Sequence, residues 1–150
     1  MTASIDPGAS IGHVHLHVAD LDRAICFYRD VLGFRVTGRI ADQLGFLAAG
    51  DYHHHVGLNT FGRPGLYHAA IRYPTRGAFL AALRRVLQAG YAVSHGSDHG
   101  SSEAVYLADP DGNGLELYWD RPRREWPQSP DGALALVNLP LDLDQLLDQR

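Results

Sequence analysis

The stretch Gly12-His13-Val14-His15-Leu16-His17-Val18 alternates polar and apolar residues along its whole length, which predicts a β-strand. A second stretch of this kind, Tyr67-His68-Ala69-Ala70-Ile71-Arg72-Tyr73, places His68 55 residues after His13. Each stretch is followed by a helix signal and then by three short apolar runs. The two stretches therefore predict an internal repeat, and this repeat decides the fold.

Each copy of the repeat contains one predicted amphipathic helix. Asp20 caps a helix over residues 21–32, and Thr75 caps a second helix over residues 77–88. Glycine ends both helices, as is common at helix C-termini. The apolar residues at helical spacing, which we expect to face inward, are Ala24, Ile25, Tyr28, Val31, Leu32, Phe79, Leu80, Leu83, Val86 and Leu87.

The three short strands after each helix complete a βαβββ module. They are predicted at residues 34–40, 44–49 and 53–60 in the first copy, and at residues 91–95, 103–108 and 115–120 in the second. One module is too small to bury both faces of its sheet. We therefore expect an α+β fold in which the two modules pair into a half-open barrel around a cavity.

The domain boundaries follow from where this pattern begins and ends. Residues 1–10 are interpreted as an N-terminal extension, and residues 11–120 as the paired domain, with modules at about 11–60 and 66–120. Residues 121–150 contain four prolines and form a Pro-rich C-terminal tail. A short helix is expected at residues 141–147, and a tail that packs on the domain as a strap is favoured over a partner-binding helix.

Composition excludes several classes of function. The net charge of -4 and the pI of about 6.1 argue against a nucleic-acid partner, and no apolar run is long enough to suggest a membrane partner. The N-terminus lacks the features of a signal peptide, so we expect a cytoplasmic protein. Cys26, the single cysteine, is interpreted as a small core residue.

Three side chains on separate predicted strands suggest a metal site. His13 and His68 occupy the same position in the two modules, and Glu116 lies between two leucines in an apolar strand. Two imidazoles and one carboxylate are the ligands of a facial triad with open positions. Pairing of Glu116 with Arg72 or Arg121 is the competing explanation, since a lone buried carboxylate is costly.

Other histidines leave more than one interpretation open. His15 and His17 share the side of the strand that His13 occupies, and a polar interior or an interface position accounts for them equally well. The run His53-His54-His55 lies in the predicted strand 53–60.

Four stretches together resemble one protein family. They are Gly12 to Leu21, Tyr52 to Thr60, Asp98-His99-Gly100, and Tyr106 to Tyr118 with its Asp109-Pro110-Asp111-Gly112-Asn113-Gly114 turn. Over residues 11 to about 127, the chain resembles the vicinal oxygen chelate (glyoxalase/bleomycin resistance/dioxygenase) superfamily. Within it, the chain is most similar to extradiol enzymes of the catechol 2,3-dioxygenase type. Larger members repeat the module pair, whereas this chain has one pair.

This resemblance implies a function and a set of roles. His13, His68 and Glu116 would bind a divalent metal, Fe(II) by family and Mn(II), Ni(II) or Zn(II) by ligand type. Partners would be a small aromatic substrate and O2, and a homodimer is expected. His55 would serve as a base and then as an acid, Tyr106 would hydrogen-bond the substrate or simply pack in its strand, and His99 would lie near the ring-binding pocket.

Two other functions remain as alternatives. One is a non-oxidative enzyme of this fold, of the glyoxalase, isomerase or lyase type. The sequence disfavours glyoxalase chemistry, because no Asp or Glu lies between Asp51 and Asp98 to complete such a site. The other is a resistance protein that sequesters an aromatic drug without chemistry, which the retained metal triad disfavours.

Overall fold

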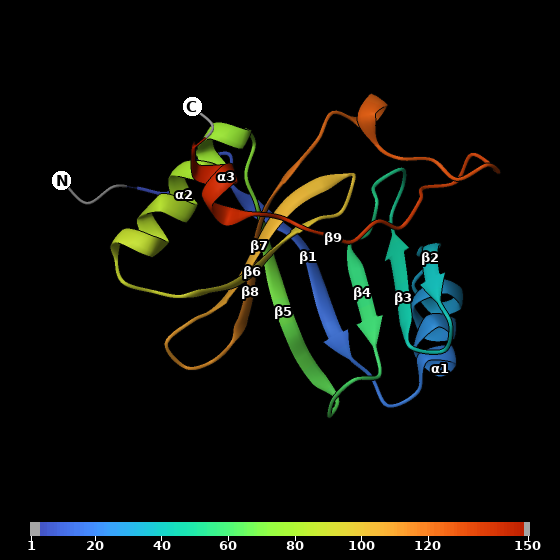
Figure 1. Cartoon of the computed structure of the whole chain (residues 1–150). Coiled ribbons are helices and arrows are strands. Elements are labelled where there is room, and N and C mark those ends of the chain that lie inside the picture. The colour runs from blue at the N-terminus through green and yellow to red at the C-terminus, as the bar shows by residue number, and fades with distance from the viewer. Residues whose placement is uncertain (1–3, 149–150) are drawn as a thin grey trace.

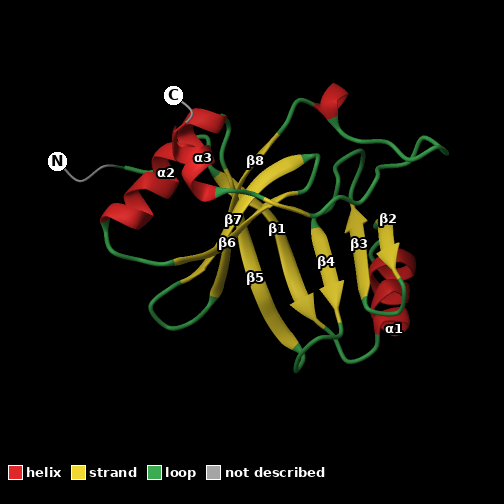
Figure 2. Cartoon of the chain, viewed as in Figure 1, coloured by secondary structure: helices red, strands yellow, loops and turns green. Residues whose placement is uncertain are grey.

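The computed structural model describes residues 4–148. Nine strands form one curled sheet in the order β2-β3-β4-β1-β5-β8-β7-β6-β9 (Figures 1 and 2). The first module contains β1 (Ser10–His17), α1 (Leu21–Cys26), η1 (Phe27–Val31), β2 (Arg35–Ile40), β3 (Leu44–Ala48) and β4 (Val56–Asn59). The second contains β5 (Gly65–Arg72), α2 (Arg76–Gln88), β6 (Val93–Asp98), β7 (Ser102–Ala108) and β8 (Gly114–Asp120). The tail contributes η2 (Arg123–Glu125), β9 (Leu139–Pro140) and α3 (Leu143–Asp148).

The two modules join along β1 and β5, which pair antiparallel at the middle of the sheet. Within the modules, β1 pairs in parallel with β4, and β5 pairs in parallel with β8. The repeat is visible in the register, because His13 lies opposite Ala70 and His15 lies opposite His68. His68 lies 55 residues after His13, and Ala70 lies 55 residues after His15, so the two pairs are equivalent in the repeat. The predicted pairing of two βαβββ modules into a half-open barrel is confirmed.

The helices cover opposite ends of the sheet (Figure 1). The predicted caps are both formed: Asp20 accepts from the backbone N–H of Arg23, and Thr75 accepts from that of Ala78. Two apolar clusters result, one under each helix. Their buried residues are Leu21, Ile25, Leu47, Val56 and Leu58 under α1, and Tyr73, Phe79, Leu80, Ala82, Leu83, Val105, Leu117 and Leu146 under α2.

The first helix departs from prediction in its second half. From Phe27 the chain continues as the π-helical turn η1, which has more residues per turn than an α-helix. The predicted inner face therefore rotates outward, and Val31 and Leu32 are exposed. The interpretation of Cys26 as a core residue was also wrong, because its thiol is exposed. In the second helix, Leu87 lies at the surface as well.

The tail crosses back over the domain after β8. Leu139 and Pro140 pair with Asp98 and Ser97 of β6, and Leu146 of α3 joins the cluster under α2. The tail is thus tied down by a short strand and by a buried leucine. Among the described residues, no helix combines the length and the apolar character needed to cross a membrane.

Candidate metal centre

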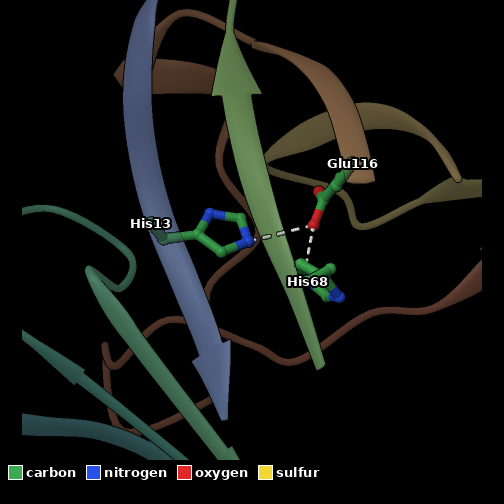
Figure 3. Close-up of side chains that lie close together, drawn as sticks. All are labelled: His13, His68 and Glu116. Atoms are coloured by element: carbon green, nitrogen blue, oxygen red, sulfur yellow. Dashed lines mark hydrogen bonds and ion pairs between the residues drawn. The ribbon is translucent and has the colours of Figure 1, made fainter. Parts of the chain in front are cut away.

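The three predicted ligands meet in the middle of the sheet. His13 comes from β1, His68 from β5 and Glu116 from β8, and these three strands are neighbours. The Nε2 atoms of His13 and His68 each lie 2.9 Å from Oε2 of Glu116 (Figure 3). All three side chains are buried. Their ligand atoms lie within 4.8 Å of one another, which is the spacing of a candidate metal site.

The donor set of this site fits a divalent cation. Nε2 of His68 is buried without a hydrogen-bond partner among the described atoms, although it faces the carboxylate. Burial alone would raise the pKa of Glu116, but the contacts with His13 and His68 outweigh it and hold the pKa well below its usual range. The carboxyl group is therefore an anion that faces two imidazoles. Two nitrogens and one carboxylate oxygen on one side of a site are the ligands of a facial triad.

The competing ion pairs do not form in the described residues. Arg121 pairs with Asp98 and Glu103, and Arg72 lies 3.9 Å from Asp120. Both arginines are thus directed to other carboxylates, and Glu116 is left to the imidazoles.

The internal repeat produces one such site and not two. In the second module, Glu116 of β8 lies opposite Ala70 of β5. The residue that corresponds to Ala70 in the first module is His15 of β1, and it lies opposite Gly57 of β4. A Cβ at Gly57 would lie 2.8 Å from Nδ1 of His15, which is closer than atoms in contact can approach. A side chain at this position would require the imidazole of His15 to move, and with glycine there the first module does not repeat the arrangement.

The three candidate metal ligands lie at the wall of a cavity of about 300 Å³. Tyr106 and His99, which were expected to lie near a substrate, line the same cavity. The Tyr106 hydroxyl lies 2.8 Å from Nε2 of His99, and Tyr106 is directly opposite Glu116 in the β7–β8 ladder. Burial, followed by the charge of Glu116, raises the pKa of Tyr106. Its hydroxyl therefore stays protonated and can donate a hydrogen bond.

The structure does not bring His55 to the cavity. Its ring packs on Tyr52 with centroids 4.8 Å apart, and its Nδ1 accepts the backbone N–H of Ala49 at 3.1 Å. His53 and His54 line the cavity in its place. The expectation for His55 assumed a strand over residues 53–60, but β4 begins at Val56. The preceding residues bend, so strand alternation does not describe which histidine faces inward.

His54 belongs to a chain of polar contacts that leads away from the metal candidates. Its ring lies 4.2 Å from that of His13, and its Nδ1 lies 2.8 Å from Nδ1 of His53. Nε2 of His53 is 2.9 Å from Oδ1 of Asp120. Tyr52 donates to the other oxygen of Asp120 at 2.8 Å and lies 2.6 Å from the Tyr118 hydroxyl. Sequence analysis missed this network, which only the fold assembles from two distant segments.

Of the remaining histidines of β1, His15 is buried and His17 is half-buried. His15 is buried and lines the cavity, and burial, together with neighbouring histidines, lowers its pKa to about 3. His17 hydrogen-bonds the side chain of Asn59. Nε2 of His15 and Nδ2 of Asn59 are buried without partners among the described residues. Each therefore offers a polar contact to a molecule in the cavity.

Comparison with known proteins identifies the scaffold. The family model of the glyoxalase/bleomycin resistance protein/dioxygenase superfamily matches residues 10–117, which contain the whole metal candidate. The chain belongs to this superfamily. A catechol-2,3-dioxygenase of Bacillus subtilis is 37% identical over 97% of the chain and 54% of its own length.

A second dioxygenase and a solved glyoxalase structure are also similar to this chain. A manganese-dependent 2,3-dihydroxybiphenyl 1,2-dioxygenase of Geobacillus genomosp. 3 is 29% identical over 88% of the chain and 41% of its own length. Among solved structures, the Mn(II)-bound glyoxalase from Novosphingobium aromaticivorans superposes with a TM-score of 0.68 at 26% identity, covering 73% of this chain and 37% of the other. The chain thus spans about half or less of the length of these superfamily members.

Proposed function

We propose that the chain is a metal-dependent extradiol dioxygenase that opens the ring of a catechol. The observation that carries the proposal is the convergence of His13, His68 and Glu116 at the wall of a cavity, with both imidazole Nε2 atoms 2.9 Å from one carboxylate oxygen. The two dioxygenase relatives support the proposal. Fe(II) is the proposed metal, and the manganese-dependent relative makes Mn(II) the first alternative.

The reaction adds both atoms of O2 to the substrate and breaks the ring bond beside the two hydroxyl-bearing carbons. When bound, a divalent metal supplies open positions and a path for electrons between the diol and dioxygen. The protein must supply the rest: it holds the ring, takes a proton from a substrate hydroxyl, and returns that proton to the product.

His54 is placed to accept this proton, because its neighbours fix its tautomer. The Asp120 carboxylate can only accept, so Nε2 of His53 carries the proton between them. When this is the only proton on the His53 ring, its Nδ1 accepts, and Nδ1 of His54 donates to it. The lone pair of His54 is left on Nε2 of a ring that lines the cavity. Burial and two histidine neighbours lower the pKa of His54, so its ring is neutral before the substrate binds.

Tyr106 and His99 form a second polar wall of the site. The Tyr106 hydroxyl can accept a hydrogen bond from a substrate hydroxyl while it donates its own proton to His99. An acceptor that is already held in place fixes the orientation of the substrate hydroxyl. We assign the pair to orientation of the diol.

Oxygen consumption by anaerobically Fe(II)-loaded protein tests the proposal directly. Catechols are the trial substrates, and the His68→Ala variant, which lacks one metal ligand, is the control. The proposal expects oxygen uptake together with a yellow ring-fission product in the wild type and neither in the variant. Absence of uptake while iron is demonstrably bound would contradict it.

The second candidate is a non-oxidative metal enzyme on the same scaffold. The similarity to a Mn(II)-bound glyoxalase supports it. Such an enzyme would convert its substrate without consuming O2, and therefore the same oxygen electrode separates the two candidates. The missing carboxylate at Gly57 weighs against the glyoxalase type.

A further inference from the structure

The part of the cavity away from the candidate metal ligands is lined by apolar side chains, whereas the ligands themselves are polar. Ile40 lines it from the end of β2, Leu44 and Phe46 line it from β3, and Phe61 lines it from the loop after β4. Leu134 to Asn138 of the tail line it from the other side. The ring of Phe46 lies 5.0 Å from that of His54, so the apolar part begins directly beside the polar site.

Three of these side chains leave apolar surface uncovered at the cavity. Ile40 is 45% exposed, Phe61 is 59% exposed and Leu136 is 44% exposed. Exposed apolar side chains gathered around a cavity mark a ligand surface more often than scattered ones do. A nonpolar group that extends from the metal site would cover them.

The tail segment that forms this wall, residues 134–140 (the strap), is fixed in place. At its end, Leu139 and Pro140 pair with β6. Near its start, the N–H of Ala135 donates to the carbonyl of Pro127 at 2.9 Å. In its middle, Nδ1 of His99 lies 3.2 Å from the Val137 carbonyl, and Leu136 packs against Gly38 of β2, where a Cβ would meet it at 3.0 Å. Hydrogen bonds and packing therefore hold the strap in position as one wall of the cavity.

The part of the chain that the structure describes offers no arginine or lysine to a charged substituent in the cavity. Within residues 4–148, no arginine is among the lining residues, and the chain has no lysine. Arg63 follows Phe61 closely but is exposed and lies outside the lining. Burying a carboxylate without a counter-charge is strongly unfavourable.

We infer that the preferred substrate is a catechol with an uncharged, nonpolar substituent, and that Leu136 of the strap is a residue that determines this specificity. The inference rests on the proposed function, because it takes the catechol ring to lie at the metal site. The substituent packs between the strap and the side chains of Ile40 and Phe61. A carboxylate at the same place loses its water and gains no partner charge.

The test measures binding first, without turnover. The Zn(II)-loaded protein is titrated anaerobically by calorimetry with catechol, 4-propylcatechol and 3,4-dihydroxyphenylpropionate, the last two being matched in length. Each fully buried methylene tightens binding by up to roughly fourfold. We expect the propyl compound to bind at least about tenfold more tightly than either of the other two. The order of kcat/KM with the Fe(II)-loaded protein should be the same.

Two variants test whether the strap sets the order. Leu136→Arg should remove the advantage of the propyl compound and strengthen binding of the propionate. Leu139→Arg is the matched control, because Leu139 is also exposed on the strap but does not line the cavity; it should keep the wild-type order.

Three results have distinct meanings. The inference would be overturned if the wild type bound the propionate as tightly as the propyl compound or more tightly. It would also be overturned if replacement of Arg63 weakened binding of the propionate. An unchanged order in Leu136→Arg would remove Leu136 as the determinant. Tight binding of the propyl compound without oxygen uptake would uphold this preference and contradict the dioxygenase activity.

Discussion

The ring of His99 connects Tyr106 to the strap. Its Nε2 lies 2.8 Å from the Tyr106 hydroxyl, and its Nδ1 lies 3.2 Å from the carbonyl oxygen of Val137. A carbonyl only accepts, so Nδ1 carries the proton of the neutral ring and Nε2 accepts from Tyr106. The strap thereby fixes the hydrogen bond of a cavity residue, and one segment both shapes the substrate wall and orients the polar site.

Replacing Tyr106 by Phe should lower kcat/KM on catechols by about ten- to a hundredfold, because the substrate hydroxyl loses its buried hydrogen-bond acceptor. The metal content should not change, because the hydroxyl is not a ligand. Steady-state oxygen uptake and metal analysis on the same preparation check both points. Unchanged turnover would assign Tyr106 to strand packing alone.

The pair of variants His54→Gln and His55→Gln separates the two neighbouring histidines. We expect His54→Gln to reduce kcat by about 10²-fold or more, the range for loss of a general base. His55→Gln should leave kcat nearly unchanged, because the half-buried His55 contacts Tyr52 and Ala49 outside the cavity. A larger loss in His55→Gln than in His54→Gln would restore the role expected from the sequence.

Asp120→Asn should act on His54 through its tautomer. The amide can donate to Nε2 of His53, which moves the His53 proton to Nδ1 and forces His54 to carry its proton on Nε2. We expect kcat to fall by roughly 10²-fold, less than the loss of about 10⁴ seen where a buried Asp orients a triad histidine. Nitrogen chemical shifts of the imidazoles in the Zn(II)-loaded protein report the tautomer. Shifts identical to those of the wild type would contradict this account.

Metal binding should stabilise the fold, because the site exists only in the folded chain. At a free metal concentration about 100 times Kd, the stabilisation is about 2.7 kcal/mol. Thermal unfolding with Mn(II) and after treatment with a chelator measures the difference. In Glu116→Gln the shift in Tm should largely disappear. A shift of wild-type size in this variant would place the metal elsewhere.

Stability of the metal-free protein should fall in acid because of His15. Burial lowers the pKa of this group to about 3 in the folded state, whereas the unfolded value is about 6.5. The unfolded state therefore binds more protons between these values, and stability is lost as the pH falls from about 6.5 toward 3. This single group contributes up to about 1.4 kcal/mol per pH unit. Denaturation of His15→Gln should show a shallower dependence; an equal slope would assign the effect to other groups.

Sequence patterns predicted the parts of the fold that are periodic and repeated. The two helix caps follow from Asp20 and Thr75 before the helical pattern. The paired modules and the meeting of His13, His68 and Glu116 follow from strand alternation and from the offset between the copies. These residues lie on central strands, where the register determines which face a side chain occupies. Alternation was therefore a reliable guide there.

The same reasoning failed where the chain leaves regular structure. The bend before Val56 turns His54 to the cavity and His55 away, and the π-helical turn after Cys26 rotates Val31 outward. Tertiary contacts between distant segments could not be predicted from the sequence either. Nothing in the local sequence shows that Asp120 will hold His53, or that the strap will reach His99.

Incorporation of labelled oxygen tests the central claim most directly. The Fe(II)-loaded protein turns over 4-propylcatechol under ¹⁸O-labelled dioxygen, and mass spectrometry is applied to the ring-opened product after rapid quenching and reduction of its aldehyde group. The account predicts that both labelled atoms enter the product, with none in a Glu116→Gln control. A product that carries no label, or an unopened ring with oxygen reduced to peroxide, would contradict the assignment of this site to ring cleavage.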